Sequence, residues 1–237
     1  MKIKHVVFMF AAALMFVWLF TCAAFADSAY DDIDFSNVVM IGDSQTGSMY
    51  RYNVRTPFLP QDNFRYTNGL SICRLASDIK SYLGDSSGGS YKDIVTKTGA
   101  DIICLMFGLN DMEHSSDKCA PAWENVINYL KQEHPDTIIV VQSVTPVTKA
   151  HRFNNKDIQH YNQELALLCT KLDVEYIDIC DGLYDDVWNL KDEYSFDGIH
   201  LNEAGTSVWR ENLKEALAKR YYTVNQTSAE ETEASGK

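Results

Sequence analysis

The feature that most constrains the fold of this chain is a repeated alternation of short apolar runs with longer segments of helical periodicity. Two of the runs, residues 38–41 (VVMI) and 102–107 (IICLMF), are apolar at every position. Such a run suits a strand that is buried on both faces, which is the situation of strands in parallel sheets covered by helices. The pattern therefore favours an α/β fold.

The same patterns predict the number and order of the elements. We expect five strands, at residues 37–41, 63–66, 101–107, 137–142 and 174–179. Helical patterns lie between them at residues 70–83, 120–133 and 154–172, and a closing helix is expected at residues 203–220. Strands that alternate with helices form a mostly parallel sheet, and right-handed crossovers place helices on both of its faces. The predicted architecture is a three-layer α/β/α sandwich with a mostly parallel five-stranded sheet.

Polar and reactive residues directly follow two of these strands. Gly42-Asp43-Ser44 comes after the first strand, and Gly108-Leu109-Asn110-Asp111 comes after the third. In open α/β sheets, ligands bind at the carboxyl ends of the strands, so these two segments are expected to meet there. Near the C-terminus, Asp197 lies three residues before His200 and adds a carboxylate and an imidazole. This combination of residue types indicates a serine hydrolase.

Together with Gly69 in Thr67-Asn68-Gly69-Leu70-Ser71, these segments resemble the SGNH, or GDSL-type, hydrolase family. The resemblance covers the chain from about residue 36 to about residue 209, with the blocks in the family's order. It departs at Gln45, where the family usually has leucine, and we expect this difference to affect packing more than activity. The resemblance implies the flavodoxin-like SGNH hydrolase fold. The four residues that give the family its name would be Ser44, Gly69, Asn110 and His200.

A serine hydroxyl is a weak nucleophile unless a neighbouring base takes its proton. Ser44 is the predicted nucleophile, and His200 is the predicted base that later protonates the leaving alcohol. Asp197 is predicted to hold the histidine in the required tautomer. The structural alternatives are an N-cap serine, a surface histidine and an aspartate that caps the following helix.

The negative oxygen that forms during attack on an ester needs hydrogen-bond donors. The predicted oxyanion hole consists of the backbone N–H groups of Ser44 and Gly69 and the side-chain amide of Asn110. Turn chemistry alone would also explain the glycine and the asparagine. Asp43 and Asp111 are expected to brace these loops through hydrogen bonds to the backbone.

The N-terminus has the layout of a secretory signal peptide. Lys2 and Lys4 precede an apolar stretch at residues 6–20, and the small residues Ala24 and Ala26 suit a signal peptidase. We expect residues 1–26 to be removed and the protein to be secreted or extracytoplasmic. The competing interpretation is an uncleaved membrane anchor, because the apolar stretch approaches the roughly 18 residues needed to span a bilayer.

Removal of this segment takes away two lysines and no acidic residue, so the formal net charge changes from -12 to -14. A strongly acidic protein does not favour nucleic acid or anionic membrane surfaces, and it suits neutral ester substrates. Residues 27–222 are expected to form one hydrolase domain. Residues 223–237, which are rich in Ser, Thr, Glu and Ala, are expected to be a disordered acidic tail.

Five cysteines follow the signal peptide, and an odd number cannot be fully paired within one chain. Cys104 is expected to be a small core residue, and one or two disulfides are possible among the others. No spacing of cysteine or histidine suggests a metal site, and the predicted chemistry needs no cofactor. These cysteines are Cys73, Cys104, Cys119, Cys169 and Cys180.

The sequence therefore predicts a secreted serine esterase that hydrolyses short acyl esters, acetyl in the first instance, through an acyl-serine intermediate. The family resemblance implies an acylated glycan or a small acyl ester as substrate. The alternatives are a lysophospholipase or lipase-like hydrolase, an O-acyltransferase and a non-catalytic glycan-binding envelope protein. Four aromatic residues are candidates for stacking on sugar rings in the cleft, although aromatic side chains belong to the core as often; they are Tyr50, Tyr52, Phe58 and Trp188.

Overall fold

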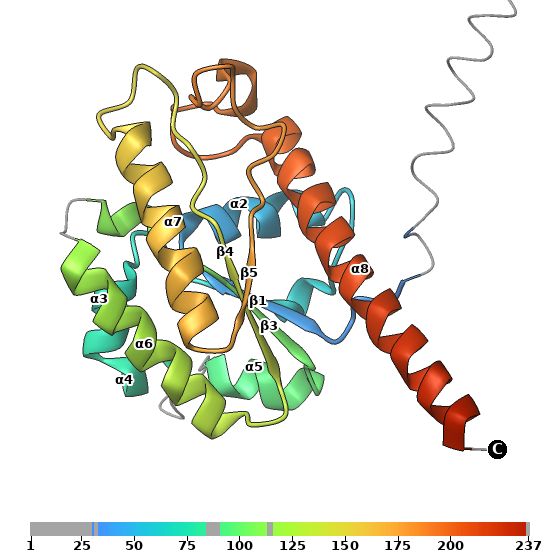
Figure 1. The fold of residues 1–237 in the computed structure, drawn as a ribbon. Coiled ribbons are helices and arrows are strands. Elements are labelled where there is room, and N and C mark those ends of the chain that lie inside the picture. Colours follow the sequence, from blue (N-terminus) through green and yellow to red (C-terminus); the bar gives the residue numbers. More distant parts are fainter. Residues whose placement is uncertain (1–29, 31–32, 84–90, 113–115, 236–237) are drawn as a thin grey trace, which may run out of the picture. The chain divides into compact units, whose positions relative to one another are not determined.

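The computed structural model describes residues 30, 33–83, 91–112 and 116–235. The segment Phe35–Leu217 forms one compact unit, which contains all five strands of the sheet (Figure 1). The described residues outside this range, namely 30, 33–34 and 218–235, belong to a second unit. The predicted signal peptide at residues 1–26 lies outside the described residues. Within the described residues, no helix is both long enough and apolar enough to cross a membrane.

The sheet has five parallel strands in the order β2-β1-β3-β4-β5, which confirms the predicted architecture. Gly42 at the end of β1 is in register with Tyr66 of β2 and Met106 of β3. The three strands therefore end at one level, and the loops that follow them leave the same edge of the sheet. The strands are β1 (Val38–Gly42), β2 (Phe64–Tyr66), β3 (Ile102–Met106), β4 (Ile138–Gln142) and β5 (Glu175–Ile177).

Seven helices and three short 3-10 turns connect and follow these strands in the described part of the chain. The helices are α2 (Ser44–Asn53), α3 (Ile72–Ser77), α4 (Ile79–Leu83), α5 (Tyr91–Thr98), α6 (Ser116–Glu133), α7 (Asn155–Lys171) and α8 (Glu203–Ser235). The 3-10 turns are η1 (Gln61–Asn63), η2 (Leu109–Asp111) and η3 (Asp192–Tyr194).

Three features of the helices differ from the sequence-based expectation. The single helix predicted at residues 70–83 is divided into α3 and α4 at Asp78, whose backbone has φ -145° and ψ 54°. Aspartate disfavours helix interiors because its side chain competes for nearby backbone groups. Helix α5 was not predicted. Helix α8 continues past the predicted end at Arg220 to Ser235, through a segment whose alanines and glutamates favour helix. The domain boundaries at residues 27–222 and 223–237 stay predictions.

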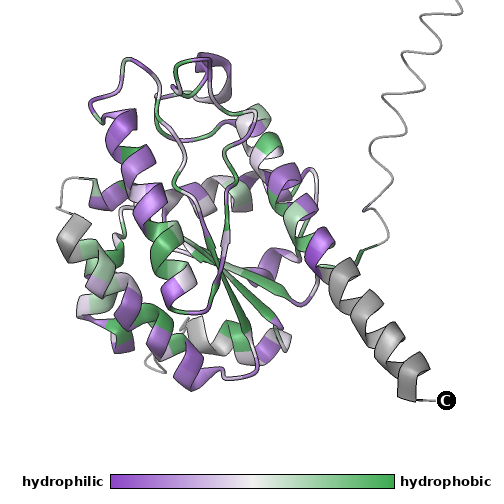
Figure 2. Ribbon diagram, in the orientation of Figure 1, coloured by the Kyte–Doolittle hydropathy of each residue, from purple (hydrophilic) through white to green (hydrophobic). Residues whose placement is uncertain are grey.

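One face of the sheet carries the main hydrophobic core. The odd-numbered residues of β1, β3 and β4 point to this face, where they pack with buried residues of α3, α5, α6 and α7. Trp123 of α6 is almost fully buried there, and its indole N–H donates to the Tyr161 hydroxyl of α7 at 2.7 Å. In Figure 2 the strands are mostly hydrophobic, and the helices around them carry both hydrophobic and hydrophilic residues.

The even-numbered strand residues point to the opposite face, because side chains alternate along a strand. Met40 and Cys104 are fully buried on this side, the latter as predicted. Trp209 of α8 is also fully buried, and its indole N–H donates to the Gln142 side chain of β4 at 2.8 Å. Helices therefore cover both faces of the sheet, in agreement with the predicted three layers. No disulfide joins the cysteines in the described part of the chain.

Candidate active site

Ser44 lies at the first position of α2, directly after the end of β1. The turn is tight, because a Cβ atom on Gly42 would lie 2.6 Å from the Met106 carbonyl oxygen. Asp43 caps the helix, and its Oδ1 accepts a hydrogen bond from the Gln45 N–H at 2.9 Å. The cap is thus provided by Asp43, and the Ser44 hydroxyl is left for another contact.

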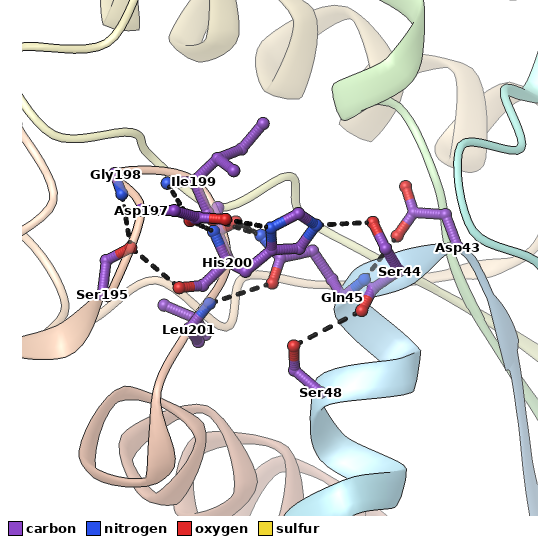
Figure 3. Close-up of polar contacts among 11 residues, drawn as sticks. Asp43, Ser44, Gln45, Ser48, Ser195, Asp197, Gly198, Ile199, His200 and Leu201 are labelled. Carbon is purple, nitrogen blue, oxygen red and sulfur yellow. Dashed lines mark hydrogen bonds and ion pairs between the residues drawn. The ribbon is translucent and has the colours of Figure 1, made fainter.

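The structure brings Ser44, His200 and Asp197 together, although 156 residues separate the first two in the chain (Figure 3). The Ser44 Oγ lies 2.9 Å from His200 Nε2, and His200 Nδ1 lies 2.7 Å from Asp197 Oδ2. With the Nδ1 proton directed to Asp197, Nε2 is free to accept the serine proton. This is the geometry expected of a nucleophile, a base and an orienting carboxylate. The catalytic roles themselves stay predictions.

The loop that carries the histidine is closed by its own hydrogen bonds. Asp197 Oδ1 accepts from the N–H groups of Ile199 and His200 at 3.0 and 2.8 Å. Ser195 Oγ accepts from the Gly198 N–H and donates to the His200 carbonyl at 2.8 Å. Partial burial would raise the pKa of Asp197, but the hydrogen bonds from His200 and from the backbone outweigh it and hold that pKa below its usual value. Asp197 is therefore charged at neutral pH and favours the required tautomer.

The three residues that carry the predicted oxyanion donors, Ser44, Gly69 and Asn110, line one cleft together with His200. Among the described residues, no group accepts a hydrogen bond from the backbone N–H of Ser44 or of Gly69. Gly69 has φ +70°, which favours glycine, and a Cβ atom there would meet no other atom within 4 Å. Both N–H groups are thus available to an oxygen of a bound ester.

Asn110 is held more tightly than the sequence suggested. Its Nδ2 donates to Asp43 Oδ2 at 2.8 Å and to the Leu70 carbonyl at 3.3 Å, so both of its amide hydrogens have partners. An oxyanion would have to compete for the hydrogen in the longer bond. Burial raises the pKa of Asp43 to about 7, although the hydrogen bonds from Gln45 and Asn110 lower it in part. Above that pH the charged carboxylate binds the Asn110 amide more strongly.

Asp111 braces the adjacent loop, as predicted. Its two carboxylate oxygens accept from the backbone N–H groups of Ile72 and Cys73 at 2.9 and 3.1 Å, at the start of α3. Asp111, Cys73 and Cys119 place possible metal-ligating atoms within 4.8 Å of one another. Burial raises the pKa of Cys119 to about 12, so this thiol is protonated at neutral pH when no metal is bound. The two hydrogen bonds from the backbone support a bracing role for Asp111.

The cleft has a volume of about 510 Å³, within the usual range for sites that bind small molecules. The aromatic residues that line it are Tyr66 and Phe196, which are 38% and 60% exposed. Phe196 also stacks on the His200 ring, with their centroids 6.0 Å apart.

None of the four aromatic residues predicted to line the cleft does so. Phe58 packs against Phe35, and Trp188 stacks on Tyr184. Tyr50 packs behind Tyr66, with ring centroids 5.5 Å apart. Tyr50, Tyr52 and Phe58 follow Ser44 closely in the sequence, but this closeness does not bring their side chains into the cleft. The aromatic lining comes instead from Tyr66 at the end of β2 and from Phe196 in the loop that carries His200, here called the histidine loop (residues 195–200), and α2 contributes residues without aromatic rings.

Sequence reasoning underestimated Gln45. This side chain is 1% exposed, and its amide contacts the peptide groups on both sides of His200. Its Nε2 donates to the Ile199 carbonyl at 2.6 Å and to Thr145 Oγ1 at 3.2 Å, and its Oε1 accepts from the Leu201 N–H at 3.4 Å. Gln45 therefore joins the helix that begins with the nucleophile to the loop that carries the base. Its departure from the family's leucine was the signal for this role.

Replacing Gln45 with leucine should lower kcat by about tenfold with little change in KM. The substitution leaves the Ile199 carbonyl and the Leu201 N–H without their side-chain partner, so the loop can shift relative to Ser44. Displacements of about 1 Å in an active site can lower rates by up to about 10²-fold. Steady-state kinetics on an activated ester would measure the effect.

A matched control is Gln142→Leu, which removes another buried glutamine amide but leaves the cleft intact. Its partner is Trp209, so this change should lower the free energy of unfolding by about 1–3 kcal/mol while kcat stays near that of wild type. Equal losses of kcat in the two variants would show that Gln45 acts through overall stability alone.

Comparison with solved structures places the fold among known esterases. A candidate platelet activating factor from Streptococcus pneumonia is 24% identical, with a TM-score of 0.63, over 88% of this chain and 99% of that one. A carbohydrate esterase of family 3 from Talaromyces cellulolyticus is 14% identical, with a TM-score of 0.53, over 77% and 96%. An acetyl xylan esterase is 17% identical, with a TM-score of 0.53, over 76% and 98%.

No curated protein matched the sequence. The family model for GDSL-like lipases and acylhydrolases matches residues 41–208, which include every residue of the site described above. The match begins at the end of β1 and closes within α8, so it spans the sheet edge and the histidine loop together. The chain therefore belongs to the GDSL-like lipase/acylhydrolase family.

Proposed function

We propose that this protein is a secreted or extracytoplasmic serine esterase that hydrolyses short-chain carboxylic esters, acetyl esters above all, on carbohydrate or cell-envelope glycan. The observation that carries the proposal is the continuous line of contacts from Ser44 Oγ to His200 Nε2 at 2.9 Å and from His200 Nδ1 to Asp197 Oδ2 at 2.7 Å. Family membership supports an acylhydrolase.

In the proposed reaction, Ser44 Oγ attacks the ester carbonyl carbon while His200 Nε2 takes the hydroxyl proton. The carbonyl oxygen becomes negative and accepts hydrogen bonds from the N–H groups of Ser44 and Gly69 and from Asn110. His200 then protonates the leaving alcohol, which departs and leaves an acyl-serine. A water molecule, activated by the same histidine, releases the acid and restores Ser44.

The preference for a short acyl group rests on the lining of the cleft. Beside Ser44, the cleft is bordered by serine, asparagine, glycine and charged side chains, and its apolar groups are Leu109, Ile199 and the rings of Tyr66 and Phe196. A long acyl chain needs a larger continuous apolar surface to leave water. The solved acetyl xylan esterase of similar fold supports the acetyl and glycan assignment. The signal peptide layout of residues 1–26 supports export.

The experiment that tests this function compares the release of p-nitrophenol from its acetate and octanoate esters by the purified protein. We expect acetate to be turned over well above octanoate, in a manner that depends on Ser44. Preference for octanoate would favour the lipase-like alternative. Absence of Ser44-dependent turnover of both esters would refute the esterase assignment and favour a dedicated acyltransferase or a binding protein.

A further inference from the structure

Arg51 introduces an exposed positive charge into the cleft of an otherwise acidic protein. It is one of the residues that line the cleft with Ser44 and His200. No carboxylate of the described residues forms an ion pair with it. By contrast, the nearby Arg55 is paired with Glu203 at 2.6 Å and lies outside the cleft. The guanidinium of Arg51 is therefore available to a ligand.

The position of Arg51 on α2 relates its charge to the reacting serine. Ser44, Ser48 and Arg51 are four and then three residues apart, which places them on one face of the helix, and all three line the cleft. Seven residues of α-helix advance by about 10 Å along the axis. The arginine side chain is long enough to bring its guanidinium closer to Ser44 than this. One small substrate molecule can therefore place its ester at Ser44 and another of its groups at Arg51.

The part of the cleft between Ser44 and Arg51 is bordered by side chains that can pack against a substrate ring. Gly47 lies on the same helix face, and a Cβ atom there would come 2.8 Å from the ring of Tyr66. The missing side chain allows Tyr66 to pack on α2 as one wall of the cleft, with Phe196 of the histidine loop also lining it. Asn68 adds a polar side chain.

We propose that Arg51 binds an anionic group, a carboxylate or a phosphate, on the alcohol part of the ester substrate. This inference rests on the proposed esterase function, because a short acyl group at Ser44 leaves only the alcohol part to extend along α2. Arginine is well suited to carboxylate and phosphate, which its planar guanidinium binds through two parallel hydrogen bonds. The overall negative charge of the protein is screened over about 10 Å in 0.1 M salt, so a local arginine can still attract an anion.

The test uses two acetate esters that differ mainly in one charge. 4-Acetoxybenzoate carries a carboxylate, and 4-acetoxybenzamide carries a neutral amide of nearly the same size. The readout is the ratio of kcat/KM for the charged ester to that for the neutral ester. Differences in leaving-group reactivity cancel when this ratio is compared between protein variants. A third ester, 4-acetoxyphenyl phosphate, measures the same ratio for a phosphate.

We expect Arg51→Gln to lower this ratio by about fivefold, the usual upper range for an exposed ion pair. Arg51→Lys should retain part of the preference, because it keeps the charge but not the planar geometry. Arg55→Gln is the matched control, since it removes a neighbouring arginine that does not line the cleft, and the ratio should stay at the wild-type value. Added salt should reduce the preference in wild type but not in Arg51→Gln.

The outcomes separate this inference from the proposed function. Ser44-dependent hydrolysis of the neutral ester, together with an equal ratio in wild type and Arg51→Gln, would overturn the anion site alone. Loss of Ser44-dependent hydrolysis of all three esters would overturn both. A larger Arg51-dependent effect with the carboxylate would indicate an acidic sugar or similar alcohol, and a larger effect with the phosphate would indicate a phosphate ester.

Discussion

Replacing Ser44 with alanine should lower kcat for ester hydrolysis by at least about 10⁴-fold while the protein stays folded. The substitution removes the hydroxyl oxygen that lies 2.9 Å from His200 Nε2 and that would form the acyl intermediate. In serine hydrolases, loss of the nucleophile leaves only the acceleration that comes from binding and from the oxyanion donors. Kinetics on p-nitrophenyl acetate, with a trap for the acyl-enzyme, would measure both the rate and the intermediate.

The control for this prediction is Ser77→Ala, which makes the same change at the end of α3. The Ser77 hydroxyl donates to the Arg74 carbonyl at 2.8 Å and does not line the cleft, so activity should remain. The Ser44→Ala protein should unfold at nearly the wild-type temperature, because Asp43 rather than Ser44 caps α2. Retention of most of the esterase activity in Ser44→Ala would contradict the assignment of the nucleophile.

The sheet could be predicted from the sequence because its strands are buried on both faces. Residues 38–41 and 102–107 contain no polar side chain, and few structures other than a covered parallel strand can bury such a run. The structure places β1 and β3 there within a residue at each end. The register between the strands, which places Gly42 opposite Met106 so that β1 and β3 end at one level, could not be predicted from any local pattern.

The contacts within the site were only partly predictable. The residue types at positions 44, 110, 197 and 200 indicated hydrolase chemistry, and the structure brings them to one cleft. The hydrogen bonds that hold them depend on long-range packing. Gln45 contacts the histidine loop 154 residues away, and Asn110 contacts Asp43 across 67 residues. Periodicity and motif spacing carry no information on such pairs.

The residues that line the cleft were also only partly predictable from the sequence. Tyr50, Tyr52 and Phe58, which follow the nucleophile closely in sequence, were candidates for lining the cleft. In the structure Phe58 packs against Phe35, and an aromatic residue of the cleft is Tyr66, the last residue of β2, which ends at the same edge of the sheet as β1. Proximity in a parallel sheet is determined by strand order, and β2 lies beside β1 at the edge of the sheet.

Replacing His200 with alanine should lower kcat as much as Ser44→Ala, whereas Asp197→Asn should lower it less, by about a hundredfold. His200 performs both proton transfers, and its Nε2 is 2.9 Å from the serine hydroxyl. Asp197 acts only on the other ring nitrogen. An asparagine there can present its N–H to Nδ1 and favour the wrong tautomer, which in serine proteases with a buried aspartate costs about 10⁴-fold.

The smaller loss expected here follows from exposure. The Asp197 side chain is 37% exposed and the His200 side chain is 30% exposed, so water can replace part of the hydrogen bonding to the ring in the variant. The loop also retains the Ser195 contacts that hold the His200 backbone. The pH profile of kcat/KM in each variant would separate the two roles, since only the Asp197→Asn protein keeps the imidazole that accepts the serine proton. A larger loss in Asp197→Asn than in His200→Ala would contradict the assignment of His200 as the base and of Asp197 as the residue that orients it.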